Sequence, residues 1–461
     1  MPGPFISSQL VRRALRLSIA EGMCWALMIG LSEAYFVAAA VRLGAGPLEL
    51  GLVVTLPLCL GAAGPLMALG VLRRLPVRKW LVVVAAVVQS SVLGAIVATD
   101  AAGALTPRLL IAAVCVYNMA GQSAGTAWAS WIGDLVPSKR RGRYFALRNR
   151  AIQVATALAL VGGGIVLDRL EPAGAAESVA LAAGGAGFRV IFLLAVASRL
   201  VSAGLLALCP EPTFRGVAQR QDAMRFLRSE RGHRTAGLLL VGAAFFVMVY
   251  LSAPYFGPFM LTELHFSYVE YMTAAVSVVL VKALVFPLWG QLLDRRGARL
   301  VFHIAVVATA LVPLPWVHAR GLGWVVAAQA LSGSSWSAYE VSYFALLLES
   351  TTRRARPHVF AIQSLLHGAA QLLGGTLGGI AFAALGSSYR ALFATSVAGR
   401  LVVAVAAVVL AARAMAPGMR RRLAVRMVGL RPHGGVVYRP LEAASDRPQR
   451  LRGASRPDDS T

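Results

Sequence analysis

Five ionisable side chains stand out within long apolar stretches of the chain: Glu33, Arg199, Lys282, Glu340 and Arg400. A charged group at the bilayer centre costs about 2.5 to 3.5 kcal/mol on insertion scales, so each needs an ion-pair partner, a water-filled cavity or a function. A carboxyl in such a place can load and unload protons, and a buried ammonium pairs with a carboxylate or loses its own proton. These residues are the first candidates for a binding or coupling site.

Polar side chains recur at helical spacing in the same stretches. Asn118 and Gln122 are four residues apart, and Gln363, His367 and Gln371 continue that spacing over two turns. Residues at i and i+4 share one helix face. The longer stripe is either hydrogen-bonding glue between helices or the lining of a cavity, and His367 could also titrate near neutrality.

Aromatic side chains concentrate in four of the stretches. They are Trp25, Tyr35, Trp128, Tyr250, Tyr255, Trp336, Tyr339 and Tyr343. Core packing explains most aromatics in apolar segments, but this concentration suits an amphipathic or aromatic organic solute better than an inorganic ion.

Twelve apolar segments must position these residues, each long enough to cross about 30 Å of hydrocarbon as a helix. They span 18–41, 49–72, 80–99, 108–135, 151–168, 188–209, 236–264, 268–293, 300–318, 323–349, 358–385 and 389–412. The chain is 57% apolar and 14% charged, whereas soluble domains carry about 25% charge. An all-α polytopic membrane protein in a lipid bilayer is therefore expected.

The net charge of +25 would ordinarily suggest nucleic acid, but apart from Arg199, Lys282 and Arg400 the basic residues lie in loops and the tail. On alternate sides of the predicted spans, 36 of the 45 Lys and Arg fall on one side and six on the other. Cytoplasmic loops keep positive charge, so both termini are expected in the cytoplasm. The excess of Arg over Lys suggests a GC-rich bacterial genome, and hence a bacterial inner membrane.

The four cysteines, Cys24, Cys59, Cys115 and Cys209, lie in or at the ends of apolar spans, with neither disulfide nor zinc spacing. We expect no metal and no cofactor. The sequence also has no P-loop that would bind ATP. It has no Asp-x-Asp or His-rich loop of the kind that a membrane enzyme would use.

The chain repeats itself. The matching pairs are Leu31–Phe36 with Leu251–Phe256, Gly125–Trp131 with Gly333–Tyr339, and Arg189–Val201 with Arg390–Val402. Two similarly oriented six-helix halves follow. The expected organisation is an N-terminus at 1–17, a first bundle at 18–209, a basic linker at 210–235, a second bundle at 236–412 and a disordered tail at 413–461.

Charged loops recur after the second and fourth spans of each half. After the second span, the second half has Gly290, Asp294, Arg295, Gly297 and Arg299, and the first half has a degenerate copy with Gly70 and Arg78. After the fourth span, the loops contain Asp134 and Arg143 in the first half, and Glu349 and Arg356 in the second. With these motifs, the chain resembles the major facilitator superfamily over about residues 15–412. The resemblance implies twelve helices in two bundles related by repeats.

That resemblance also implies roles for single residues. The loop set would latch the cytoplasmic side when the protein faces outward, with Asp294, Arg295 and Arg299 as its better-preserved part. Arg199 and Arg400 lie at equivalent positions on helices outside the central cavity and are expected to be structural. Glu33 and Glu340 each occur in one half only, which favours a function for them.

Two substrate-class signatures are incomplete. Gly162-Gly163-Gly164 lacks the proline of the drug-antiporter pattern, and Pro210-Glu211 matches the sugar-porter pattern only in part.

We therefore predict a non-enzymatic, monomeric secondary transporter that moves a small organic solute by alternating access, coupled to protons through Glu33 or Glu340. The alternatives are a sensor that keeps the fold without transport and, less favoured, a membrane enzyme acting on a lipid-linked substrate.

Overall fold

A computed structural model describes residues 8–74, 77–135, 141–171, 185–211, 229–351, 356–414, 425–430 and 436–440. The first half contains α1 (Ser8–Ser32), η1 (Glu33–Tyr35), α2 (Phe36–Arg42), α3 (Pro47–Gly61), α4 (Gly64–Arg74), α5 (Arg78–Ala101), α6 (Pro107–Leu135), α7 (Arg141–Leu170) and α9 (Ala186–Leu208). The second half contains α11 (Glu230–Tyr250), η3 (Ala253–Tyr255), α12 (Phe256–Thr262), α13 (Tyr268–Arg296), α14 (Ala298–Ala310), α15 (Leu314–Val317), α16 (Leu322–Ser350), α17 (Arg356–Ala384) and α18 (Tyr389–Ala414). The expected all-α polytopic fold is confirmed.

Ten helical stretches of the described chain are long and apolar enough to cross a membrane. The other two predicted spans correspond to α6 and α16, helices of 29 residues each that carry more polar side chains along their length. The count of twelve spans stays a prediction. The helix α7 begins at Arg141, ten residues before its predicted span, so that the helix contains residues first assigned to a loop.

The first spans of the two halves are broken at the same repeated sequence. The helix α1 gives way to η1 at Glu33, and α11 is followed by η3 at Ala253. These 3-10 turns lie within the Leu-Ser-x-x-Tyr-Phe repeats that begin at Leu31 and Leu251. Broken helices in membrane proteins occur where other protein groups satisfy the freed backbone, and they often border binding sites.

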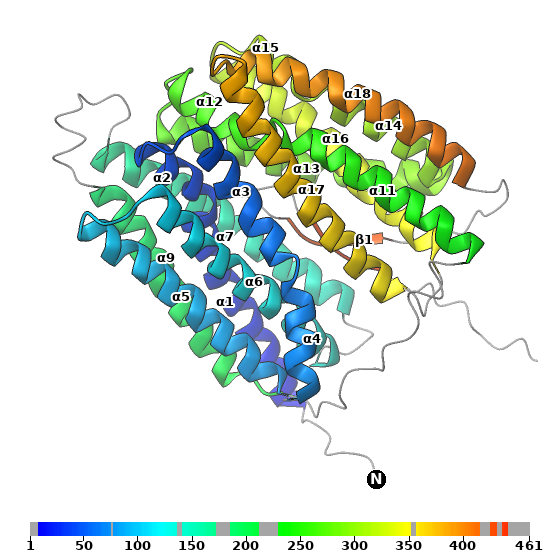
Figure 1. The fold of residues 1–461 in the computed structure, drawn as a ribbon. Helices are drawn as coiled ribbons and strands as arrows, with labels where there is room; N and C mark the ends of the chain where they lie inside the picture. The colour runs from blue at the N-terminus through cyan, green and yellow to red at the C-terminus, as the bar shows by residue number, and fades with distance from the viewer. Residues whose placement is uncertain are drawn as a thin grey trace, which may run out of the picture.

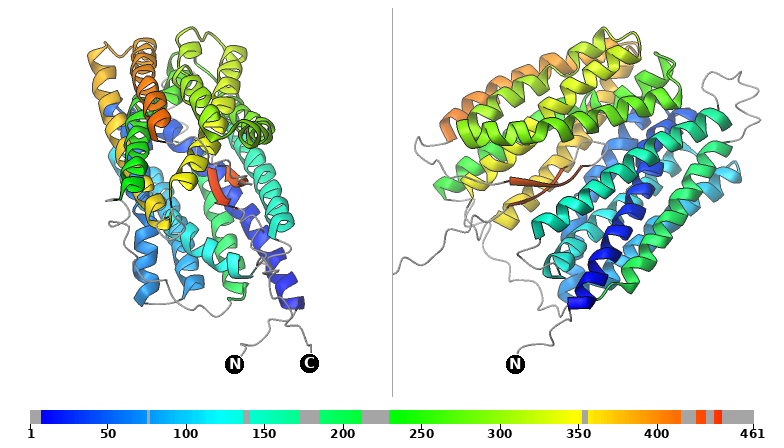
Figure 2. Two further views of the ribbon diagram at one scale, coloured as in Figure 1. Left: turned by 90° about the vertical axis from the view of Figure 1, so that its right-hand side faces the viewer. Right: turned by 180° about the vertical axis from the view of Figure 1, so that it is seen from behind.

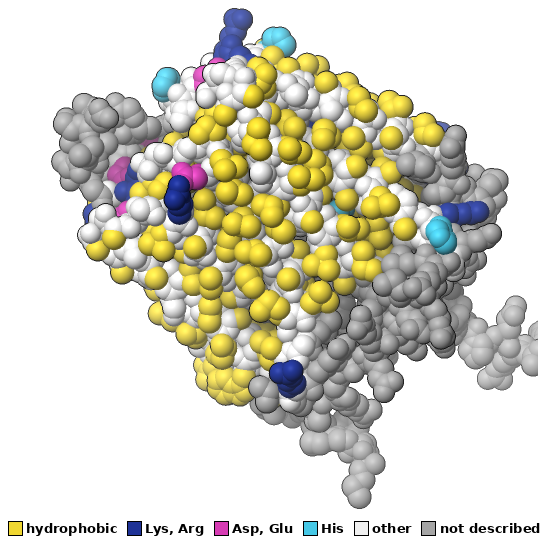
Figure 3. Space-filling model, in the orientation of Figure 1, with side chains coloured by type: hydrophobic (Ala, Val, Ile, Leu, Met, Phe, Trp, Pro, Cys, Tyr) yellow, Lys and Arg dark blue, Asp and Glu magenta, His cyan; other side chains and the backbone are white. Residues whose placement is uncertain are grey.

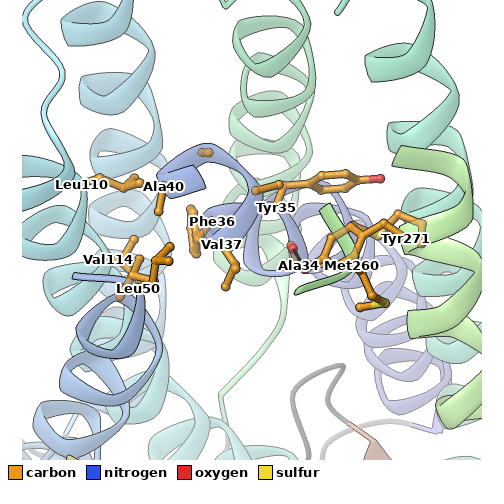
Figure 4. Packing of buried hydrophobic residues seen from close by; sticks show 14 of the residues in the cluster. Ala34, Tyr35, Phe36, Val37, Ala40, Leu50, Leu110, Val114, Met260 and Tyr271 are labelled. Atoms are coloured by element: carbon orange, nitrogen blue, oxygen red, sulfur yellow. Dashed lines mark hydrogen bonds between the residues drawn. The ribbon is translucent and has the colours of Figure 1, made fainter. Parts of the chain in front are cut away.

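The main hydrophobic core shared by the two bundles lies towards one end. One cluster of buried residues draws on both bundles, including Phe36 and Leu50 with Met260 and Tyr271. Figure 4 shows these side chains meeting beside the break in the first helix. Two further clusters lie wholly or mainly within single bundles. The ribbons accordingly meet near α2 and α12 and diverge at the opposite end (Figures 1 and 2). We call the shared end the closed end and the opposite end the basic end.

Close backbone approaches hold the bundles together at the closed end. The helix α3 packs along α17, and α7 packs along α13. A Cβ atom at Gly51 would lie 2.7 Å from the carbonyl oxygen of Gly375, and a Cβ at Gly375 would lie 2.5 Å from Thr55. Glycine is required there because any side chain would push α3 and α17 apart.

The outer surface of the described chain is apolar. Hydrophobic side chains cover most of the face in Figure 3, and basic side chains appear mainly towards its margins. Leu284 and Val402 are 75% and 71% exposed. Such a surface fits lipid and not water. At the closed end, Arg42 pairs with Asp100, and Arg390 pairs with Glu263 at 3.0 Å, so these cations are neutralised locally.

The tail contains an antiparallel hairpin, β1 (Val425–Leu430) with β2 (Val436–Pro440). The register runs from Val425 opposite Pro440 to Leu430 opposite Val436, with an irregularity between Met427 and Gly429. Figures 1 and 2 place the hairpin between the two bundles, and β1 contacts α7. These two short runs are strands, although a disordered tail is expected from the sequence, and each contains two valines, which favour extended backbone.

Candidate substrate and coupling site

The second bundle contains a buried ion pair between two of the predicted residues. Lys282 on α13 donates from its Nζ to Oε1 of Glu340 on α16 at 2.8 Å, and their side chains are 4% and 10% exposed. A buried pair is tolerated only when both charges are well matched, and removal of one partner leaves an uncompensated charge. Of Glu33 and Glu340, the two acids predicted to carry the coupling proton, Glu340 is the one in contact with Lys282.

Aromatic rings on α11 and α16 cluster about one helical turn from Glu340. Trp336 lies one helical turn before Glu340 and meets Phe246 of α11 edge-on, with ring centroids 5.9 Å apart. Phe246 also stacks on Tyr250 at 6.0 Å, and Trp336 meets Tyr339 at 5.5 Å. We call the rings of Phe246, Tyr250, Trp336 and Tyr339 on α11 and α16 the ring wall. An ion pair close to such a wall suits a solute with both a flat apolar part and a polar group.

His367 joins this wall from α17. Its ring stacks on Phe246 with centroids 4.0 Å apart and faces Tyr343 at 5.7 Å. Its Nε2 atom is buried and has no hydrogen-bond partner in the described part of the chain. Gln363 and Gln371 are half-buried one turn to either side. His367 thus packs through ring stacking and leaves a polar atom unsatisfied within the protein.

Glu33 lies in the first bundle, at the start of the 3-10 turn that interrupts the first helix. The hydroxyl of Tyr117 on α6 donates to its Oε1 at 3.3 Å and also contacts the sulfur of Met28 at 2.7 Å. The side chain is half-buried. Glu33 and Glu340 therefore lie in different bundles, each beside tyrosine or tryptophan rings, and they do not form a single acidic cluster.

A buried charge network in the first bundle was not anticipated as a unit. Arg148 donates to Oε2 of Glu21 at 3.1 Å, and the hydroxyl of Ser202 donates to Oε1 of the same carboxylate at 3.1 Å. Arg199 donates to Ser202 at 2.8 Å and to Gln89 at 2.7 Å. Arg199 also lies 3.9 Å from Oε1 of Glu21, so two guanidinium groups share one carboxylate and the network ties α1, α5, α7 and α9 together.

The signal for this network was present in the sequence. Glu21 lies within the first apolar stretch, but its partner Arg148 was assigned to a loop because the predicted fifth span began at residue 151. The earlier start of α7 places Arg148 on a helix within the bundle.

The candidate site residues on the fourth span, Asn118, Gln122 and Trp128, face two directions. Trp128 lies under the guanidinium of Arg148, with Cζ 4.1 Å from the ring centre, a cation–π contact. The side-chain stem of Gln122 lies over Gly61 and Gly64, near Asn118. Gln122 and Asn118 therefore help pack α6 against α3 and α4.

Arg400, at 1% exposure, has no carboxylate among its described contacts, and its guanidinium is held by neutral groups. It donates to the carbonyl oxygens of Val249 at 2.9 Å and Thr309 at 3.1 Å, and to the hydroxyls of Ser252 at 2.9 Å and Ser396 at 3.1 Å. Val249 and Thr309 lie in the last turns of α11 and α14, whose final carbonyls lack intrahelical partners. Arg400 thus caps the end of α11, at the break in the seventh span, and the end of α14.

Tyr255, a predicted site residue, lies elsewhere. Its hydroxyl donates to the carbonyl oxygen of Pro47 on α3 at 2.9 Å, across the boundary between the bundles. It lies against Gly51 and Gly379 at the closed end. Tyr255 is therefore a bundle-to-bundle contact and does not join the ring wall.

The second-half loop motif is exposed in this structure. Asp294 and Arg295 project from the end of α13, and Gly297, with φ of 88°, turns the chain into α14. Arg299 and Glu349 are half-buried beside this turn. Gly290 has open space around its α-carbon, as does Gly70 in the first half. The side chains of Asp134, Arg143 and Arg356 lie outside the described residues.

Arg78, from the degenerate first-half motif, is fully buried. Its backbone N–H donates to Oε1 of Glu211 at 3.0 Å, its guanidinium lies 3.4 Å from the same oxygen, and the Lys79 N–H donates to Oε2 at 3.3 Å. A carboxylate at a helix N-terminus is favoured by the exposed N–H groups and the helix dipole. The Pro210-Glu211 sequence therefore caps α5 and fixes Arg78, and the role of Arg78 in the cytoplasmic latch stays a prediction.

Among the described residues, no group of three or more His, Cys, Asp or Glu side chains could hold a metal ion.

The comparisons with known proteins agree with this architecture. The family model described as "Major Facilitator Superfamily" matches residues 238–432. No curated protein sequence matches the chain. The resemblance inferred from the repeats and loop motifs is thus confirmed, most directly in the second half.

Solved structures extend the fold likeness to both halves. A POT family transporter in complex with 5-aminolevulinic acid is 11% identical with a TM-score of 0.67, covering 90% of this chain and 98% of its own. The nucleoside transporter NupG is 14% identical with a TM-score of 0.62, covering 87% and 98%. The D-xylose-proton symporter is 16% identical with a TM-score of 0.58, covering 85% and 96%. The chain therefore has the major facilitator fold.

Proposed function

We propose that this protein is a secondary active transporter that moves a small organic solute across a bacterial cytoplasmic membrane by alternating access. The observation that carries the proposal is the buried Lys282–Glu340 pair beside the ring wall of α11 and α16. Structures of this fold include proteins named for a nucleoside and for a sugar with a proton, which supports a solute of similar size.

The orientation follows from the distribution of charge. Loops at the basic end hold most Lys and Arg, so we place that end and both termini in the cytoplasm. The bundles share their core at the opposite end, which corresponds to a state closed to the outside. A solute would then reach the ring wall from the cytoplasm in this state and from the outside after the bundles rock.

Coupling to protons would use Glu340 or Glu33. A proton on Glu340 would weaken its attraction for Lys282 and free the ammonium for the solute or for another state of the protein. Glu33 lies beside Tyr117 at the helix break and offers a second carboxyl, in the first bundle. Each acid occurs in one half only, which suits an asymmetric site.

The test begins with purified protein screened by thermal shift against metabolites and drugs, because a ligand of the folded state raises its apparent stability. Ligands that stabilise the protein are then offered to proteoliposomes. Uptake into vesicles that contain the protein, and not into empty vesicles, is the expected result. A ligand that stabilises the protein but is never taken up would favour the sensor. A ligand recovered chemically altered would favour an enzyme.

A further inference from the structure

The helix α13 satisfies only part of its own N-terminus. The first N–H groups of a helix have no intrahelical partner. Here Ser267 and Glu270 form a capping box in which Glu270 N donates to Ser267 Oγ at 3.2 Å and Ser267 N donates to Glu270 Oε2 at 2.9 Å. This reciprocal pair leaves the N–H groups of Tyr268 and Val269 without a partner from their own helix.

Those two groups are satisfied by a carboxylate from the other bundle. Asp168, near the end of α7, accepts from Tyr268 N at 2.7 Å through Oδ1 and from Val269 N at 3.1 Å through Oδ2. The carboxylate also faces the positive end of the α13 dipole. Charge-assisted hydrogen bonds of this kind are stronger than neutral ones.

The surrounding contacts fix this geometry. Gly164, one turn before Asp168 on α7, approaches so closely that a Cβ there would lie 3.0 Å from the carbonyl oxygen of Tyr268. The Tyr268 ring meets Phe188 of α9 edge-on, with centroids 5.8 Å apart. Gly164 belongs to the Gly162-Gly163-Gly164 run, and its missing side chain lets α7 reach the start of α13.

We propose that Asp168 is a positioning residue that latches the closed end by capping α13 across the bundle boundary. The latch exists only when the bundles meet there, because both oxygens bond to the opposite bundle. Opening of this end must therefore release two backbone N–H groups and one carboxylate to water. The inference rests on the proposed alternating access, and it assigns to this acid a role distinct from substrate or proton binding.

A distance measurement across the closed end tests the latch. Spin labels are placed at Leu109→Cys and Leu385→Cys, one in each bundle and both exposed, after Cys24, Cys59, Cys115 and Cys209 are replaced by alanine. We expect Asp168→Asn to raise the ratio of long to short distances about tenfold, as loss of one charge-assisted bond would. The full chain is used in nanodiscs, without substrate or gradient.

The chain offers a matched control for the acid. Glu171 caps a helix N-terminus with the same chemistry, accepting from Gly187 N at 2.7 Å and Phe188 N at 3.2 Å, but within the first bundle. Glu171→Gln should leave the distance ratio unchanged. If Asp168→Asn and Glu171→Gln give the same distribution as the parent, the latch is refuted.

A glycine pair keeps the test decisive if Asp168→Asn fails to fold. Gly164→Ala should push Tyr268 away and raise the same ratio, whereas Gly162→Ala on the same helix meets open space and should not. An unchanged Gly164→Ala distribution would overturn the inference. Because distances are read without transport, shifted distances in a protein that carries no solute would support the latch and count against the proposed function.

Discussion

Lys282 and Glu340 depend on each other because both lie in the low-dielectric interior of the second bundle. Removing the carboxylate charge leaves the ammonium without its ion-pair partner, a change that costs roughly 3–5 kcal/mol in buried pairs. Replacing both by apolar residues of similar size removes the charges together and is often neutral. The pair can therefore be tested for stability separately from transport.

We expect Glu340→Leu to lower the melting temperature of the purified protein by several degrees, and Lys282→Met with Glu340→Leu to recover most of the loss. Differential scanning fluorimetry in one detergent compares the two variants with the parent. Equal melting temperatures for the single and double variants would show that the ion pair does not contribute to folding.

Individual site residues differed in how far the sequence could predict them. Lys282 and Glu340 could be predicted as candidates because charge within an apolar span is conspicuous, but their contact depends on how α13 meets α16, which no local pattern specifies. Tyr255 was misplaced because an aromatic residue gives the same sequence pattern whether it faces a site or the opposite bundle.

At the scale of elements, glycine determines how closely the bundles pack. Gly375 of α17 faces Thr55 of α3 so tightly that a Cβ would lie 2.5 Å away. Such contacts carry van der Waals packing between membrane helices, where the hydrophobic effect contributes little. The close packing of α3 against α17 should therefore be sensitive to a single methyl group.

We expect Gly375→Ala to destabilise the protein by about 1–3 kcal/mol, as overpacking does. Gly204→Ala on α9, where a Cβ meets nothing within 4 Å, is the matched control and should be neutral or slightly stabilising. Thermal melts of both variants decide the matter. The packing argument fails if Gly204→Ala is the more damaging change.

Apolar length and repeats predict the elements well and their ends poorly. The repeated Leu-Ser-x-x-Tyr-Phe sequence revealed the two halves, yet only the structure shows that each copy marks a helix break. The start of α7 was missed by ten residues because Arg143, Arg148 and Arg150 interrupt the apolar pattern. Composition alone does not distinguish charged side chains that form ion pairs within a bundle from charged side chains in loops.

At the scale of the whole molecule, we propose that two acids favour opposite states of the protein. Asp168 bonds across the closed end in this structure. Asp294 at the basic end is exposed. We expect Asp294 to take part in the cytoplasmic loop latch only when the basic end closes. Alternating access requires that neither latch dominate, so the balance between the two sets the populations.

We expect Asp294→Asn to lower the ratio of long to short distances between labels at Leu109→Cys and Leu385→Cys, the reverse of Asp168→Asn. The double variant should return close to the parental ratio, because distant sites contribute nearly additively. The same distance measurement serves for both. A double variant that behaves like Asp168→Asn alone would remove Asp294 from the cytoplasmic latch.

Proton coupling through a buried acid is the central claim, and transport in proteoliposomes tests it most directly. The parent should concentrate a solute that passes the binding screen when a pH gradient is imposed, and should exchange it without a gradient. For the coupling acid, Glu33→Gln or Glu340→Gln should retain exchange and lose gradient-driven accumulation. If both variants still accumulate the solute with the parental pH dependence, neither carboxyl carries the proton and the claim is contradicted.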